Sequence, residues 1–305
     1  MKSHFGFRIF LVLAILSASL APLAAQSMTD PSAAPVKDNV PFVQIIPHFE
    51  IGTLAVLYHT YQAGAEGTDF NMITQGGQDI LFPYQRYSVD LVLGGHNRFT
   101  FLYQPLTLNT STVADRNGSN GGQPVVIDDA TFAPGTPIDI TYGFDFWRLS
   151  YLYDFSNDPS TILGAGISLQ VRNASIVFTS VGQSPAERAV SQNIGPVPIL
   201  KVHAAHWFSP QFGLDFEADG FYASSAFFNG AAQPFTGWIW DAALSAKTAF
   251  MRGATAYATL RSIGGGATGN NAYSYTSATT QTAANPYTQN ILATAALTLG
   301  VSIER

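Results

Sequence analysis

Acidic side chains recur at every second position in one segment of the chain. Asp215, Glu217 and Asp219 alternate with apolar residues, and residues two apart in a β-strand point to the same face. The three carboxylates would therefore form one row. Such a row can pair with basic side chains of neighbouring strands, or set the selectivity of a narrow passage for small solutes.

The histidines form a weaker pattern. His59 lies near the expected end of a strand, and Asp69 and Asp79 follow it in a loop. A histidine beside carboxylates can activate a water molecule, although a solvated histidine at the rim of a sheet is the simpler interpretation. His203 and His206 are three apart, so on a strand they face opposite sides and do not easily share a metal. We predict no catalytic residue, no metal site and no cofactor.

Composition excludes several classes of protein. The chain has 305 residues, no cysteine, 11% charged and 13% aromatic residues. Low charge with many aromatics argues against disorder. A formal net charge of -6 offers no basic surface, so no nucleic-acid partner is expected. Without cysteine there is no disulfide, no thiol nucleophile and no thiolate metal site.

The N-terminus has the features of an export signal. Lys2 precedes an apolar run at residues 9–16, and small residues follow, which is the order of regions in a secretory signal peptide. We predict a cleaved signal peptide over residues 1–25. Residues 26–41, rich in small residues and proline, are expected to be a flexible periplasmic lead.

The remainder, residues 42–305, alternates polar and apolar residues with a period of two, which predicts half-buried strands. Short and long connections also alternate. We predict ten strands, with eight or twelve as alternative counts, near residues 48–62, 84–95, 97–110, 138–155, 161–179, 196–208, 211–223, 236–250, 253–264 and 289–303.

This rhythm is typical of an all-β fold, a single antiparallel transmembrane β-barrel with short periplasmic turns and long extracellular loops. One face of the strands is apolar and aromatic and the other carries charges, as expected when lipid surrounds the barrel and polar groups fill the lumen. The strand at 138–155 changes phase, which predicts a β-bulge near residues 145–148. A secreted soluble β-domain remains the alternative fold assignment.

The position of each charge in its strand predicts a network inside the lumen. Because eight strands leave room only for side chains or one small ligand, a barrel of this size has a narrow interior in which charges should pair. The predicted lumen charge network, a candidate pore or plug, contains Asp90, Arg148, Asp154, Arg172, Lys201, Asp215, Glu217, Asp219, Asp241, Lys247 and Arg261, and the same rule adds Glu50, Arg86 and His203.

Several stretches resemble an uncharacterised family of bacterial outer-membrane β-barrel proteins. The resemblance spans about residues 96–267 and rests on HNRFTFLYQPLTL (96–108), TFAPGTPIDITYGFDFWRLSYLYDF (131–155), LGAGISLQVRNASI (163–176), GPVPILKVHAAHW (195–207), LDFEADGF (214–221) and ATLRSIGGGA (258–267). It implies a barrel in the outer membrane of a Gram-negative bacterium. It implies no established activity.

Our main functional hypothesis is a non-enzymatic outer-membrane barrel. It would be either a narrow, porin-like passage for small solutes or ions, or a structural barrel with a salt-bridged lumen. The alternatives are a barrel enzyme acting on lipid or peptide at the extracellular rim, and the secreted soluble β-domain binding a ligand. The expected partners are outer-membrane lipid and the barrel-assembly and periplasmic chaperone machinery.

Overall fold

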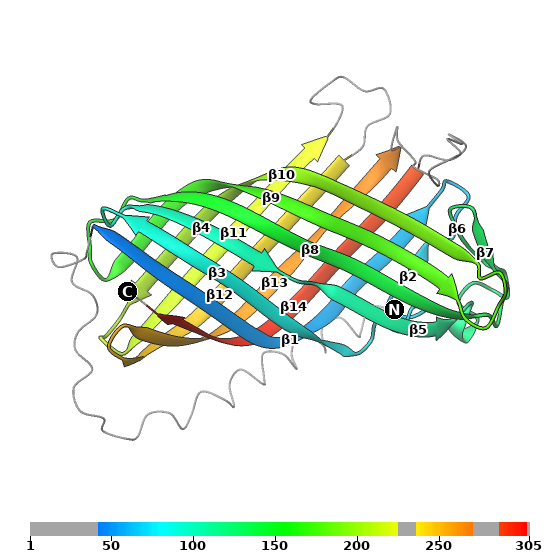
Figure 1. Cartoon of the computed structure of the whole chain (residues 1–305), viewed down its shortest axis with the longest axis horizontal. Helices are drawn as coiled ribbons and strands as arrows, with labels where there is room; N and C mark the ends of the chain where they lie inside the picture. The colour runs from blue at the N-terminus through cyan, green and yellow to red at the C-terminus, as the bar shows by residue number, and fades with distance from the viewer. Residues whose placement is uncertain (1–41, 225–235, 271–286, 304–305) are drawn as a thin grey trace. The chain divides into compact units, whose positions relative to one another are not determined.

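A computed structural model describes residues 42–224, 236–270 and 287–303, which all belong to one compact unit. The predicted signal peptide and flexible lead lie outside the described residues. Figure 1 shows strands that run obliquely around a barrel. Among the described residues, no helix is long and apolar enough to cross a membrane.

The strands of the barrel follow one another around it in chain order, and the hairpin at residues 125–132 forms a separate two-stranded sheet. They are β1 (Val43–Ala63), β2 (Phe70–Asn71), β3 (Leu81–Leu93), β4 (Asn97–Gln104), β5 (Thr107–Val113), β6 (Val125–Ile127), β7 (Ala130–Phe132), β8 (Pro137–Asp154), β9 (Thr161–Ser180), β10 (Arg188–Trp207), β11 (Phe212–Ser224), β12 (Thr236–Met251), β13 (Ala254–Asn270) and β14 (Tyr287–Ile303), with one short 3-10 turn, η2 (Arg116–Gly118).

Pairing of β1 with β14 closes the sheet. It runs antiparallel from His48 opposite Ser302 to Ala63 opposite Thr288. Because β4 and β5 both pair with β8 and share one position, and β2 pairs only with β1, the closed barrel has ten strand positions. The prediction of a ten-stranded antiparallel barrel is confirmed.

The half of the barrel next to the short turns carries an apolar belt on its outside. Outward side chains of β8 in this half are Trp147, Leu149, Tyr151 and Tyr153, all at least partly exposed. Corresponding outward residues on the other strands are Ile45, Phe49 and Ile51 of β1, Val89 of β3, Phe99 and Phe101 of β4, Leu163, Ile167 and Leu169 of β9, Leu200 and Val202 of β10, Leu214 and Phe216 of β11, Leu244 of β12 and Leu299 of β14. On β9 the outward apolar residues run from Leu163 to Val171, a span of nine residues, which matches the ~9–11 needed to cross a bilayer.

The pattern reverses in the half next to the long loops. There the outside of β8 becomes polar, with Asp139 and Thr141, whereas Ile138, Ile140 and Tyr142 turn into the barrel and are buried. The connections after β1 and β5 add buried side chains such as Phe70, Val125 and Phe132 to the same apolar core. Figure 1 shows the β6–β7 hairpin at this end of the barrel. This half is built like a soluble barrel, with its apolar residues inside.

Three sequence-based details need correction. β8 pairs with β9 without a register shift from Ile138 to Asp154, so the predicted bulge at residues 145–148 is wrong. The change in hydrophobic phase reflects the reversal described above. The register instead shifts between Val56 and Tyr58 of β1 and between Ala249 and Met251 of β12.

The remaining corrections concern strand ends. β10 begins at Arg188, so the connection after β9 is only residues 181–187 and not the long loop expected over 180–195. β13 continues through the glycines at 264–266 to Asn270. The rings of Trp238 and Trp240 on β12 cover Gly266 and Gly264 at the positions that a Cβ would occupy, which explains why glycine is tolerated inside this strand.

Candidate functional site: the charged interior

An ion-paired layer crosses the middle of the barrel. Its centre is Asp241 on β12, which is 1% exposed. Arg261 on β13 donates to its Oδ1 at 2.7 Å, and the Nη1 atoms of Arg86 and Arg148 each lie 3.1 Å from its Oδ2. Three guanidinium groups from three different strands therefore converge on one carboxylate.

Further carboxylates balance these three cations. Arg148 also contacts Asp219 at 3.0 Å, and Arg261 contacts Glu50 at 3.3 Å. Three buried arginines thus face three buried carboxylates, Glu50, Asp219 and Asp241. Pairing of this kind is what permits charges to remain ionised away from water.

Two neutral amides also belong to the layer. The predicted network held charged residues and one histidine, so it did not include them. Gln104 Oε1 accepts from Arg86 at 2.6 Å and from the Tyr84 hydroxyl at 3.1 Å. Gln170 Oε1 accepts from Arg148 at 2.8 and 3.0 Å. The alternation along β4 and β9 places both glutamines inside, so the signal is present in the sequence.

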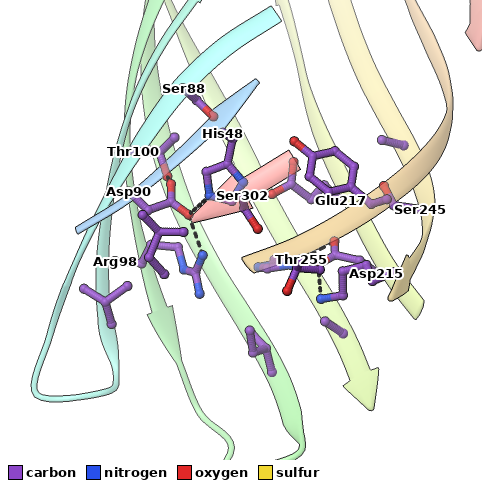
Figure 2. A pocket seen from close by; sticks show the side chains of 18 of the residues that line it. His48, Ser88, Asp90, Arg98, Thr100, Asp215, Glu217, Ser245, Thr255 and Ser302 are labelled. Carbon is purple, nitrogen blue, oxygen red and sulfur yellow. Dashed lines mark hydrogen bonds and ion pairs between the residues drawn. The ribbon is translucent and has the colours of Figure 1, made fainter. Parts of the chain in front are cut away.

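A lower cavity lies between this layer and the short turns. Its volume is about 220 Å³, and it is lined mostly by charged and hydroxyl side chains. On one wall Asp90 accepts from Arg98 at 2.5 Å, from Thr100 at 2.6 Å and pairs with His48 at 3.1 Å (Figure 2). Arg98 was absent from the predicted network, although its alternation with Phe99 and Phe101 places it inside.

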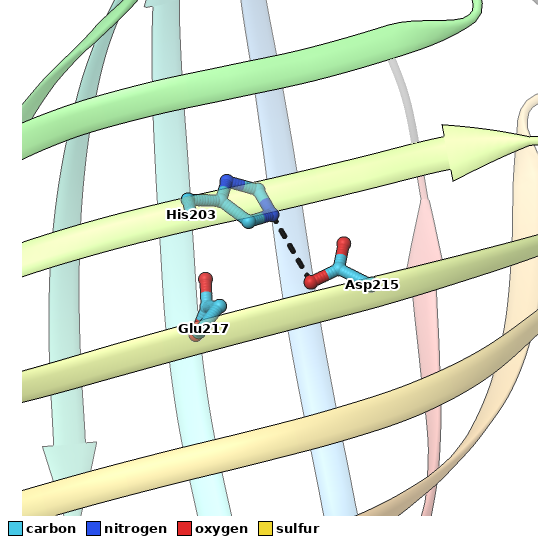
Figure 3. Close-up of side chains that lie close together, drawn as sticks. All are labelled: His203, Asp215 and Glu217. Atoms are coloured by element: carbon cyan, nitrogen blue, oxygen red, sulfur yellow. Dashed lines mark hydrogen bonds and ion pairs between the residues drawn. The ribbon is translucent and has the colours of Figure 1, made fainter.

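The opposite wall holds the acidic row of β11. His203 Nε2 lies 3.0 Å from Asp215 Oδ1 (Figure 3), and Lys247 Nζ lies 2.9 Å from Asp215 Oδ2. Lys201 Nζ lies 3.4 Å from both Glu217 and Asp219. The predicted row and its pairing with basic side chains of neighbouring strands are therefore present.

One group in this wall has the donor set of a metal site. The ligand atoms of His203, Asp215 and Glu217 lie within 4.8 Å of one another, and Figure 3 shows all three side chains on adjacent strands. Imidazole and carboxylates suit a divalent transition metal. Lys201 and Lys247 already supply cations to these carboxylates, so a metal ion would have to displace an ammonium group.

Asp154 and Arg172 have other surroundings. Asp154 lines the lower cavity and accepts from the backbone N–H groups of Ser156 and Leu163 at 2.9 and 3.0 Å, so it also holds the β8–β9 turn. Arg172 lies on the far side of the ion-paired layer, 6.0 Å from the centre of the Phe144 ring. Of the predicted network, Arg172 is therefore the residue that the fold places apart.

The histidine arrangement considered at the outer rim does not form. His59 is fully buried, with its Nδ1 2.6 Å from Gln78 Oε1 and its ring edge-on to Tyr142 at 4.5 Å. Asp79 instead pairs with Arg116 at 3.6 Å. The partner of His59 is thus an amide, which cannot orient a general base as a carboxylate does.

A second cavity of about 180 Å³ lies in the half next to the long loops. Among the described residues, none lines both this upper cavity and the lower one. Arg86, Arg148 and Arg261 of the ion-paired layer line the inner end of the lower cavity. The described residues thus line two separate cavities, one on either side of the layer.

A closed antiparallel barrel with an apolar outer belt and a charged interior defines the class of outer-membrane β-barrels. No protein-family model matches the chain, and no curated protein matches it.

Solved structures are similar to this chain only at low sequence identity. The outer membrane protease OmpT from Escherichia coli is 11% identical with a TM-score of 0.49, over 88% of this chain and 100% of its own. A FadL homologue from Pseudomonas aeruginosa is 9% identical with a TM-score of 0.33, over 86% and 89%. The toluene transporter TodX from Pseudomonas putida is 8% identical with a TM-score of 0.31, over 89% and 91%. Likenesses this distant carry no conclusion about function, and the class rests on the strand pairing and side-chain pattern of this chain.

Proposed function

We propose that the protein is an integral outer-membrane barrel that is closed to solutes, a structural barrel whose lumen is sealed by the ion-paired layer. The observation that carries the proposal is Asp241, nearly inaccessible to water and bound by three arginines. A passage for ions requires water and mobile counter-ions along its length, and charges that are buried and ion-paired to one another offer neither.

The outer half supports the same interpretation. Buried side chains from the long connections, including Phe70, Met72 and Phe132, pack between the strands above the layer. Two separate features, one polar and one apolar, therefore occupy the interior.

Location in the membrane is part of the proposal. The apolar belt would contact outer-membrane lipid, because side chains such as Ile167 and Leu299 are more than half exposed on the outside of the barrel. Export by a cleaved signal peptide and insertion by periplasmic chaperones and the barrel-assembly machinery would deliver the chain there.

Conductance of the folded protein in a planar bilayer tests the proposal. We expect insertion without discrete conductance steps. Steps that change when Asp215, Glu217 and Asp219 are all replaced by the corresponding amides would contradict it, since they would show an open pore with its filter at the acidic row. Protease protection or heat-modifiable gel mobility of the same sample confirms that the barrel is folded and inserted.

A further inference from the structure

The upper cavity differs in character from the charged interior below it. Its walls include Tyr142, Phe144, Ile176 and Leu292, which are aromatic or aliphatic. Residues of the long connections, such as Gly64 and Ile127, also line it, so it lies at the long-loop end of the barrel. The volume of the upper cavity is about 180 Å³. Since one water molecule needs roughly 10–15 Å³ of cavity volume, the cavity holds on the order of a dozen water-sized groups.

Arg172 also lines this cavity. Among the described residues no carboxylate lies within ion-pairing distance of its guanidinium, and its Nε is buried without a hydrogen-bond partner. The other basic side chains inside the barrel all have a carboxylate within 3.4 Å, namely Arg86, Arg98, Arg148, Lys201, Lys247 and Arg261. The Arg172 guanidinium is half-buried and contacts the Phe144 ring, and this contact compensates poorly for the loss of hydration of its charge.

We propose that the upper cavity binds a small amphipathic carboxylate, whose carboxyl group pairs with Arg172 and whose apolar body packs against Tyr142, Phe144 and Ile176. A guanidinium binds a carboxylate through two parallel hydrogen bonds. The single positive charge matches a monoanion, and the apolar walls favour an apolar body over a sugar or a second charged group. The volume suits a ligand of about ten non-hydrogen atoms.

Asp128 is the acidic residue that lines this cavity, in the turn between β6 and β7. Burial and the neighbouring Asp129 raise the pKa of its carboxyl above the usual value. When ionised, Asp128 opposes the binding of an anion. Replacing Asp128 therefore gives a second, independent test of anion binding in the same cavity.

Phenylacetate is a suitable probe, because it has about ten non-hydrogen atoms and one carboxylate. Isothermal titration calorimetry on the full-length folded barrel in micelles at pH 8 measures its binding. We expect Arg172→Gln to weaken phenylacetate binding roughly 10- to 100-fold, the range of a lost charged hydrogen-bonding partner. Asp128→Asn should tighten it roughly twofold or more. Phenylacetamide, which is neutral, should bind the original protein and the Arg172→Gln variant equally.

Arg188→Gln is the matched control, because Arg188 begins β10 at the same end of the barrel, is exposed and does not line the cavity. It should bind phenylacetate like the original protein. Equal binding to the original protein and to Arg172→Gln would overturn the proposal, since it would indicate partition into the micelle. No detectable binding to the original protein would also overturn it. Heat-modifiable mobility of every variant separates loss of binding from loss of folding.

Discussion

At the scale of the residue, Asp241 illustrates how the interior tolerates charge. Asp241→Asn keeps the shape of the side chain but leaves Arg86, Arg148 and Arg261 with one carboxylate fewer among them. Removing one partner of a buried ionic cluster costs about 3–5 kcal/mol. We therefore expect the free energy of unfolding, measured in urea with the barrel in lipid vesicles, to fall by about that amount. Glu66→Gln, at an exposed loop position, should change it by less than about 0.5 kcal/mol, and equal losses in the two variants would show that the layer is not a special element of stability.

At the scale of the element, β12 and β13 depend on close contact between tryptophan and glycine. A Cβ on Gly264 would overlap the ring of Trp240 and approach Leu292 O to 2.6 Å, whereas one on Gly195 of β10 would meet nothing within 4 Å. We expect Gly264→Ala to destabilise the barrel by about 1–3 kcal/mol, as overpacking does. Gly195→Ala serves as the matched strand control and should be nearly neutral. The same urea titration measures both, and a neutral Gly264→Ala would mean that the Trp240 ring moves aside freely.

At the scale of the whole molecule, the reversal along β8 marks where lipid should end. Leu149 and Thr141 lie on the outer face of this strand, Leu149 within the apolar belt and Thr141 beyond it. An arginine facing lipid costs about 2–4 kcal/mol near the bilayer midplane and about 0–1 kcal/mol near its surface. Leu149→Arg should therefore lower the free energy of unfolding in vesicles several times more than Thr141→Arg. Similar losses would place the hydrophobic boundary elsewhere or argue for a soluble barrel.

The alternation of side chains made much of the fold predictable. In β11 and β14 every second residue faces the same way, so the face of each charge, including Asp215 and Glu217, follows from its position in the strand. Where the prediction failed, as at the supposed bulge in β8, the strand kept its alternation while its surroundings changed from lipid outside to core inside. Periodicity reports which residues share a face. It does not report what that face meets.

The sequence by itself determined the strands, their order and the inward direction of the charged side chains, because these follow from local alternation and from the length of the connections. Only the tertiary structure decided which charges meet. Arg86, Arg148 and Arg261 reach Asp241 from β3, β8 and β13, no two of which are neighbours, and that convergence depends on closure and strand tilt. For the same reason Arg172, which also faces inward, has no carboxylate within ion-pairing distance among the described residues. Its position along β9 places it above the layer, and the sequence of one strand does not specify that height.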